Sequence, residues 1–214
     1  MNTTVMGVNL RAFAKSPSIV VKLDGNLRSI CVGTFYEDEE LFQVVDALRP
    51  QVIAIGTPLT LPAGLCCLEP TCECDFECQE AKGRQFELEL SQMGVSCFFT
   101  SKRTVVRDLI YRGLDLYHRL SGMGAQVIEV YPHATKKILF GDKVPREHVT
   151  GALNFMNKEL SRLIPGLNHD SSDLDRNTWH AVLNAYTGFL HLSNATDTLG
   201  NPTEGVLVIP KLPR

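Results

Sequence analysis

Short apolar stretches at the start of the chain predict three successive β-strands. Residues 5–10, VMGVNL, have the continuous apolar character of a buried strand. Residues 18–36 predict two further strands, joined at Asp24, Gly25 and Asn26, residue types that suit the backbone of a tight hairpin turn. Three strands in succession indicate an antiparallel meander.

Helical periodicity dominates the rest of the chain and predicts five helices. In the first, apolar residues recur at i, i+3, i+4 and i+7, Asp38 precedes it as an N-cap, and Pro50 stops it. The predicted helices span residues 39–49, 80–93, 104–120, 148–164 and 176–192.

Apolar segments between these helices predict the remaining strands. Residues 51–59 have the continuous apolar character of a central strand covered on both faces. Residues 125–132 predict a further strand, with Glu129 near its C-terminal end. Residues 95–100 predict a short strand or an extended link. Residues 205–210, GVLVIP, predict a small edge strand that ends at Pro210. Strands that alternate with helices indicate an α/β architecture.

Composition places this pattern in one globular domain, 1–214, with a Cys-rich loop insertion at about 62–80. The 214 residues are 44% hydrophobic and 21% charged, which is an ordinary globular composition. The net charge of −3 excludes a global positive field that would attract nucleic acid. Because the chain shows neither a long apolar run nor an apolar leader, we expect no membrane contact and a cytoplasmic location.

The Cys-rich loop is the strongest local sign of chemistry. Five of the seven cysteines lie in residues 66–78. Thiolates of Cys66, Cys72, Cys74 and Cys78, with Cys67 as a spare, can close around one tetrahedral zinc ion or hold an iron–sulfur cluster. The spacing matches neither standard motif, so a reduced, solvent-exposed loop with an oxidisable pair remains the alternative.

Several segments carry a resemblance to a known family. In order and spacing they resemble a bacterial and archaeal domain-of-unknown-function family described as predicted ribonuclease H-like nucleases. The resemblance covers nearly the whole chain and implies the ribonuclease H-like fold, with a central mixed sheet flanked by helices. The segments are VIAIGTPLTLP, KGRQFELELSQMGVSCFFTSKR, QVIEVYPHATKKILFG, HAVLNAYTGFLH and GNPTEGVLVIP.

The resemblance also implies acidic residues that hold divalent metal, but this chain departs from that pattern. Two Mg²⁺ ions about 4 Å apart need anionic oxygen ligands to activate water and stabilise the leaving oxygen of a phosphodiester. Where the family has acids, the chain has Asn9, Gly56 and His180, and only Glu129 retains a carboxylate. A divalent metal in this cleft is therefore doubtful.

Three functions remain open from the sequence. The first is a catalytically impaired binding or regulatory module. The second is an active metal-dependent nuclease or phosphodiesterase in which Glu129 and His180 are the catalytic ligands of Zn²⁺ or Mn²⁺. Asp170, Asp173 and Asp175, just before the last helix, can replace the lost acids in that case. The third is a small-molecule or nucleotide sensor that uses the same cleft.

Polar and basic side chains supply the remaining candidates. Lys82 and Arg84 are candidate phosphate contacts for a nucleic acid or nucleotide partner, with ordinary surface charge as the alternative. A further basic group lies in residues 101–119, and a polar stripe follows the last helix; for both, a solvated face is the alternative. His133 is either a site residue or a core or capping histidine. The basic group and the stripe consist of Lys102, Arg103, Arg107, Arg112, Arg119 and His180, Asn184, Thr187, His191.

Overall fold

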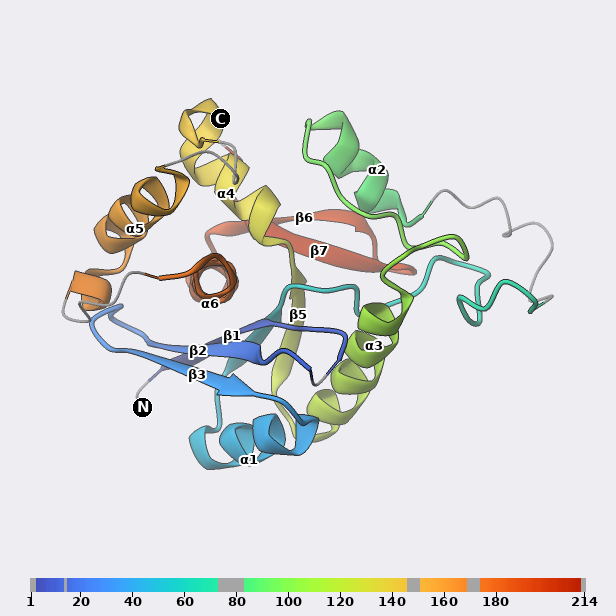
Figure 1. The fold of residues 1–214 in the computed structure, drawn as a ribbon, viewed down its shortest axis with the longest axis horizontal. Helices are drawn as coiled ribbons and strands as arrows, with labels where there is room; N and C mark the ends of the chain where they lie inside the picture. Colours follow the sequence, from blue (N-terminus) through green and yellow to red (C-terminus); the bar gives the residue numbers. More distant parts are fainter. Residues whose placement is uncertain (1–2, 14, 73–82, 146–150, 169–173, 213–214) are drawn as a thin grey trace.

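A seven-stranded mixed sheet runs through the centre of the molecule, with strand order β3-β2-β1-β4-β5-β7-β6 (Figure 1). The computed structural model describes residues 3–13, 15–72, 83–145, 151–168 and 174–212. Within these residues, no helix is long and apolar enough to cross a membrane.

The strands form two connected parts. An antiparallel meander of β1 (Thr4–Asn9), β2 (Ser18–Asp24) and β3 (Ile30–Phe35) makes one half. Next to β1 lie β4 (Val52–Ile55) and β5 (Gln126–Val130), both parallel to it. The other half ends with β7 (Gly205–Pro210), parallel to β5, and β6 (Thr196–Asn201), antiparallel to β7.

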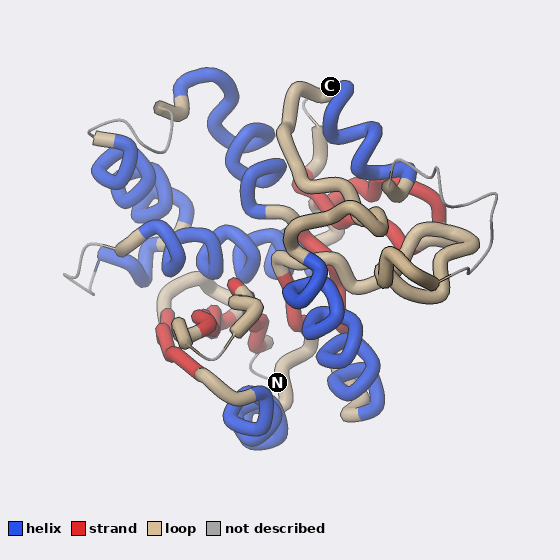
Figure 2. Tube along the Cα trace, turned by 45° about the vertical axis from the view of Figure 1, so that its right-hand side comes forward, coloured by secondary structure: helices blue, strands red, loops and turns tan. Residues whose placement is uncertain are grey.

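Helices cover both faces of this sheet (Figures 1 and 2). On one face lie α1 and α3, and on the other lie α4, α5 and α6, while α2 packs beside β6 and β7. The bounds are α1 (Asp38–Leu48), α2 (Gln85–Gln92), α3 (Arg107–Gly122), α4 (Pro132–Phe140), α5 (Ala152–Leu163) and α6 (Arg176–Leu192), with short 3-10 turns at Gly141–Lys143 and Pro165–Asn168.

The central strands are apolar on both faces because both faces are covered. In β4, Val52 and Ala54 belong to the cluster that reaches toward α6, whereas Ile53 and Ile55 pack with α1 and α3. Successive side chains of a strand point to opposite faces, so a continuous apolar run fills two cores at once. This is why the sequence of β4 shows no alternation.

Helix α6 approaches β1 unusually closely at Gly7. A Cβ atom at Gly7 would lie 2.1 Å from Ala185 N and 2.3 Å from Ala181 O, both backbone atoms of α6. Only glycine permits this contact, because no side chain could yield there. The contact sets α6 directly against the strand that leads to Asn9.

The prediction of an α/β chain whose mixed sheet combines an antiparallel meander with parallel strands is confirmed. The last helix agrees with the predicted residues 176–192. The edge assignment of residues 205–210 is wrong, because β7 lies between β5 and β6. Residues 95–100 form a link, and α4 was not predicted.

Candidate functional site

The carboxyl ends of β1, β4 and β5 bring three of the predicted site residues to one edge of the sheet. Asn9 ends β1, Gly56 follows β4, and Glu129 lies in β5 opposite Ile55. The Gly56 amide donates to Val8 O at 3.0 Å, which ties this edge together. In open α/β sheets this edge is where ligands commonly bind.

Glu129 is buried there under an arginine. Arg84 donates from Nη1 to Glu129 Oε2 at 2.8 Å and from Nη2 to Oε1 at 2.9 Å, a bidentate pair. The backbone N–H of Leu59 donates to the same Oε2 at 2.8 Å. Glu129 is 7% exposed and Arg84 is 1% exposed, so both charges are removed from water.

A second carboxylate completes this arrangement, which we call the Arg84 network (Arg84, Glu87, Glu129, Thr60 and Thr100). Glu87 Oε1 accepts from Arg84 Nε at 3.0 Å and from Nη2 at 2.8 Å. Thr100 donates to Glu87 from its backbone N–H and its hydroxyl, and Arg84 Nη1 also reaches Thr60 Oγ1 at 3.0 Å. These bonds engage all three side-chain nitrogens of Arg84 with protein acceptors.

Burial and charge perturb the pKa values of this network. Burial is the largest effect on Glu129 and raises its pKa, only partly opposed by Arg84. For Arg84, burial acts to lower the pKa, but Glu129 and Glu87 together raise it above its ordinary value. The two directions have different causes: Arg84 meets two anions, which favour its charged form, whereas burial of Glu129 outweighs the attraction of the guanidinium that it shares with Glu87.

A side-chain amide from α6 fills the space that a side chain at position 56 would occupy. A Cβ atom at Gly56 would lie 2.4 Å from Asn184 Nδ2, and this same Nδ2 donates to Val8 O at 2.8 Å. Asn184 is fully buried, and its Oδ1 has no hydrogen-bond partner among the described residues. A neutral amide therefore stands where the family resemblance implies an acid.

The other predicted ligands contact neighbouring residues of α4 and α6. Asn9 Nδ2 donates to Asn177 O at 3.0 Å, which joins β1 to the first turn of α6. His180 lies in α6 with its ring against Trp179 at 4.1 Å and His133 at 4.9 Å between ring centroids. Asp175 is the N-cap of α6 and accepts from Thr178 N at 2.7 Å.

An acidic two-metal centre does not fit these residues. Glu129 is bound by Arg84 and Leu59, Asn9 and Gly56 offer no carboxylate, and Asp175 is used as a cap. Asp170 and Asp173 lie outside the described residues. Hard divalent cations need several anionic oxygens. Among the described residues, the strand ends themselves present one carboxylate, Glu129, and both it and the nearby Glu87 are already paired with Arg84.

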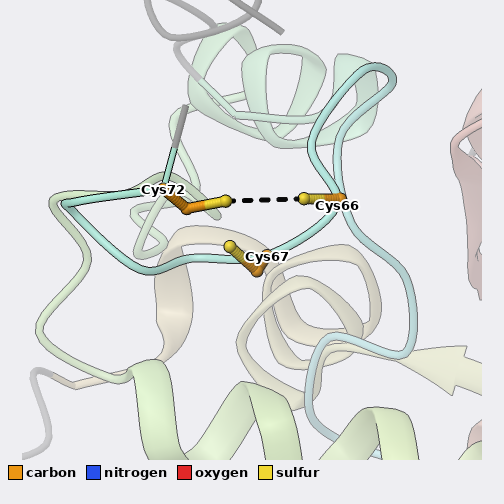
Figure 3. Close-up of side chains that lie close together, drawn as sticks. All are labelled: Cys66, Cys67 and Cys72. Carbon is orange, nitrogen blue, oxygen red and sulfur yellow. Dashed lines mark hydrogen bonds between the residues drawn. The ribbon is translucent and has the colours of Figure 1, made fainter. Parts of the chain in front are cut away.

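Within the described part of the chain, one group of metal-ligating side chains lies close enough together to share an ion. It consists of Cys66, Cys67 and Cys72, whose sulfurs all lie within 4.8 Å of one another (Figure 3). The Cys66 and Cys72 sulfurs are 3.8 Å apart. These three residues can bind a metal. Cys74 and Cys78 lie outside the described residues.

The loop that carries these cysteines is anchored to α3. Leu65 and Leu68 form a small buried cluster with Ile110. Tyr111 accepts from the backbone N–H of Leu68 at 2.8 Å and donates to Glu69 at 3.2 Å. This segment therefore has its own apolar cluster and polar contacts, which help to position the three sulfurs.

The predicted basic surface is largely neutralised by ion pairs. Arg112 is mostly buried and binds Asp38 at 2.6 Å, and Arg119 binds Glu39 at 2.9 Å. Arg107 likewise pairs with a loop carboxylate. Arg84 belongs to its buried network, which leaves it no side-chain nitrogen for a phosphate, and Lys82 lies outside the described residues.

A cavity of about 160 Å³ lies beside the Arg84 network. It opens between the ends of β4 and β5, the first turn of α2, the 97–98 link and the start of α3. Apolar side chains make most of its lining, and Arg84, Glu87 and Glu129 form one polar wall. Nothing in the hydrophobic pattern of the sequence indicates such a space.

Two features of the site were missed or misread in the sequence. The i, i+3 pair Arg84 and Glu87 was a possible signal, but burial of both charges follows only from the tertiary fold. The polar stripe of α6 is not a solvent face at its centre. Asn184 and Thr187 are fully buried, and Thr187 shares a 2.8 Å hydrogen bond with Thr135 of α4.

Comparison of the chain with models of known protein families and with curated proteins found no match.

Proposed function

We propose that the chain is a ribonuclease H-like protein that has lost two-metal hydrolysis and serves as a binding module. The observation that carries this proposal is the bidentate ion pair that Arg84 forms with both carboxylate oxygens of Glu129. Glu129 is the one acid retained from the family pattern, and its charge is already paired with a buried guanidinium. It is therefore a poor ligand for a divalent metal ion, which needs several unpaired anionic oxygens.

The element order supports the ribonuclease H-like part of the proposal. Three antiparallel strands, a helix, a parallel strand, further helices, a second parallel strand and the late helix α6 follow in the order that the resemblance implies. Asn9, Gly56 and Glu129 then lie at the strand ends where the family resemblance implies its acids.

A nuclease assay tests the loss of hydrolysis. Single-stranded and RNA–DNA hybrid substrates are incubated with Mg²⁺, Mn²⁺ or Zn²⁺, and the chain is compared with its Glu129→Gln variant. We expect no cleavage above the level of the variant. Metal-dependent cleavage that Glu129→Gln abolishes would establish the alternative, an active nuclease with a rearranged metal site.

A salt series tests what the module binds. Because Arg107, Arg112 and Arg119 are paired with acids, we propose that its ligand is a small molecule and not a nucleic acid. Binding of an oligonucleotide should then be weak and respond little to salt. A steep gain in affinity as salt falls would indicate several phosphate contacts and reject this part of the proposal.

We further propose that the cysteine group holds a zinc ion. Sulfurs bound at about 2.3 Å to one tetrahedral zinc ion lie roughly 3.8 Å from one another. The Cys66 to Cys72 separation of 3.8 Å equals that spacing and is far longer than a disulfide bond. A 4Fe–4S cluster attaches each thiolate to a different iron, which spreads the sulfurs farther apart than a single ion does. Two thiolates of a 2Fe–2S cluster share one iron, so metal analysis separates that case from zinc.

Metal analysis of the purified protein tests the zinc proposal. We expect about one zinc per chain, lost in a Cys66→Ser/Cys72→Ser double variant. Cys31→Ser is the matched control, since Cys31 is exposed on β3 away from the loop. Iron with acid-labile sulfide would indicate a cluster instead, and metal-free protein would reject both.

A further inference from the structure

The cavity beside the Arg84 network has the size and lining of a small-molecule site. Its volume of about 160 Å³ is close to that of apolar cavities that accept a single benzene ring. Phe98, at its mouth, is 65% exposed, so a ligand can enter from solvent. The apolar lining includes Phe86, Leu90, Phe98, Val106, Leu109 and Val130.

The polar wall of the cavity selects against anions. Three charged residues line it, Arg84, Glu87 and Glu129, with two formal negative charges against one positive charge. Each nitrogen of the guanidinium already donates to Glu87, Glu129 or Thr60. A phosphate or carboxylate in the cavity would meet an excess of negative charge with no arginine donor turned to it.

The same wall can accept hydrogen bonds. Glu129 Oε1 accepts one bond, from Arg84, among the described residues, whereas Oε2 accepts two. Thr57 also lines the cavity and is 4% exposed, and its hydroxyl has no hydrogen-bond partner within the described part of the chain. Neighbouring atoms cover this hydroxyl oxygen, so a ligand meets it only when the side chain turns. A buried polar atom without a partner is costly, so a ligand that supplies one gains affinity.

We propose that this cavity binds a single-ring aromatic molecule bearing an amine or hydroxyl donor. The ring occupies the apolar part between Phe86 and Leu109, and the donor reaches the wall formed by Thr57 and Glu129. This inference deepens the proposed binding role by naming the class of ligand. It uses the cleft at the strand ends without any metal.

Four one-ring probes of similar size separate the contributions of shape and charge. Benzylamine, phenol, toluene and benzoate are titrated into the full-length protein and followed by calorimetry and ligand-detected NMR. We expect benzylamine and phenol to bind about tenfold more tightly than toluene, because each adds one hydrogen bond to a buried acceptor. Benzoate should bind weakest. Equal affinities, tightest binding of benzoate, or no binding at millimolar concentration would overturn the proposal.

Two neighbouring valines give a matched pair of variants. Val106 lines the cavity, whereas Val105 is 82% exposed and does not. Val106→Trp should fill the cavity and weaken benzylamine binding by at least about tenfold, and Val105→Trp should leave it unchanged. Thr57→Val, of nearly the same shape, should remove part of the preference for donors over toluene. Unaltered binding in Val106→Trp would place the probe elsewhere and reject the cavity.

The outcomes for the ligand class and for the loss of hydrolysis are read independently. Probe binding is measured without nucleic acid or added metal, and cleavage is measured without the probes. A protein that cleaves nucleic acid yet binds benzylamine would contradict only the proposed function. A protein that does neither would contradict only the ligand class.

Discussion

Arg84 is the side chain on which the candidate site most depends. It is 1% exposed and neutralises two carboxylates that are themselves buried. Arg84→Met would leave Glu87 and Glu129 facing each other without a cation. Breaking a buried pair by removing one partner leaves uncompensated charge, so we expect a loss of about 3–5 kcal/mol in the free energy of unfolding.

Denaturant titration checks this prediction when the variant and the parent chain have the same m-value. Arg84→Lys keeps the charge but has three donors in place of a planar fork, so its loss should be intermediate. The exposed Arg103 supplies the control, since Arg103→Met should change stability by less than about 0.5 kcal/mol. Equal stability of the Arg84→Met variant and the parent chain would mean that the network carries little net energy.

The raised pKa of Glu129 predicts a pH dependence with a definite sign. Because burial raises the folded-state pKa above that of the unfolded chain, the protonated carboxyl favours the folded state. Its contribution is complete below the ordinary pKa of a glutamate and is lost as pH rises through the folded-state value. The stability advantage of the parent chain over Glu129→Gln should therefore shrink as pH rises above the ordinary pKa of a glutamate.

An exposed glutamate provides the opposite case for the same measurement. The hydrogen bond from Arg119 lowers the pKa of Glu39, so its contribution is present above the ordinary pKa and is lost as pH falls. We therefore compare the free energy of unfolding of each variant with that of the parent chain across pH. As pH rises, the loss in Glu129→Gln should shrink, whereas the loss in Glu39→Gln should grow. The same sign for both would refute the burial of Glu129 as the cause.

Residue types at the strand ends were predictable from sequence, but their partners were not. The absence of acids at positions 9, 56 and 180 is visible in the printed chain. Arg84 and Glu129 are 45 positions apart in the sequence. Their ion pair depends on how α2 packs against the sheet, which the sequence does not show. The positive φ of the β2–β3 turn falls on Leu27, not on the predicted Gly25 or Asn26, because Asp24 organises that turn by accepting from Arg28 and Ser29.

Helix α6 packs closely against the end of β4, where Asn184 of α6 lies next to Gly56. A side chain at 56 would collide with the Asn184 amide, which is buried and hydrogen-bonded to Val8. Gly56→Asp alone should lower stability by about 1–3 kcal/mol, as overpacked cores do. Asn184→Ala should also destabilise, because it removes a buried hydrogen bond.

The double variant Gly56→Asp/Asn184→Ala should lose less stability than the sum of the single losses, by about 1 kcal/mol or more. Equilibrium unfolding of the four proteins completes the cycle. Gly122→Ala is the control, because nothing lies within 4 Å of its Cβ position, and it should be close to neutral. Strict additivity would mean that the two residues do not compete for the same space.

Elements with strong periodicity were predictable, and elements with mixed signals were not. The apolar stripe of α6 gave its bounds, and the apolar run of β4 indicated its central place. In contrast, β6 has the sequence TDTLGN, which is mostly polar, and it is ordered by pairing with β7. Because the sequence pattern does not predict β6, it places residues 205–210 at the edge of the sheet.

At the scale of the whole molecule, the cysteine loop and the sheet are stabilised by separate sets of contacts. Leu65, Leu68 and Ile110 form their own cluster, distinct from those that cover the two faces of the sheet. A metal that binds only the folded loop stabilises the states in which that loop is folded. Its removal should therefore open the loop locally and leave the sheet intact.

Amide hydrogen exchange before and after chelation measures this separation. We expect faster exchange of Leu68 and Cys72, whose N–H groups donate to Tyr111 and Glu69, and no change at Gly56, which donates across the sheet edge to Val8. The Cys66→Ser/Cys72→Ser variant should reproduce the chelated pattern without chelator, and Cys31→Ser should not. Uniform loss of protection throughout the sheet would mean that the metal stabilises the entire fold, and an unchanged loop would mean that its contacts with α3 suffice alone.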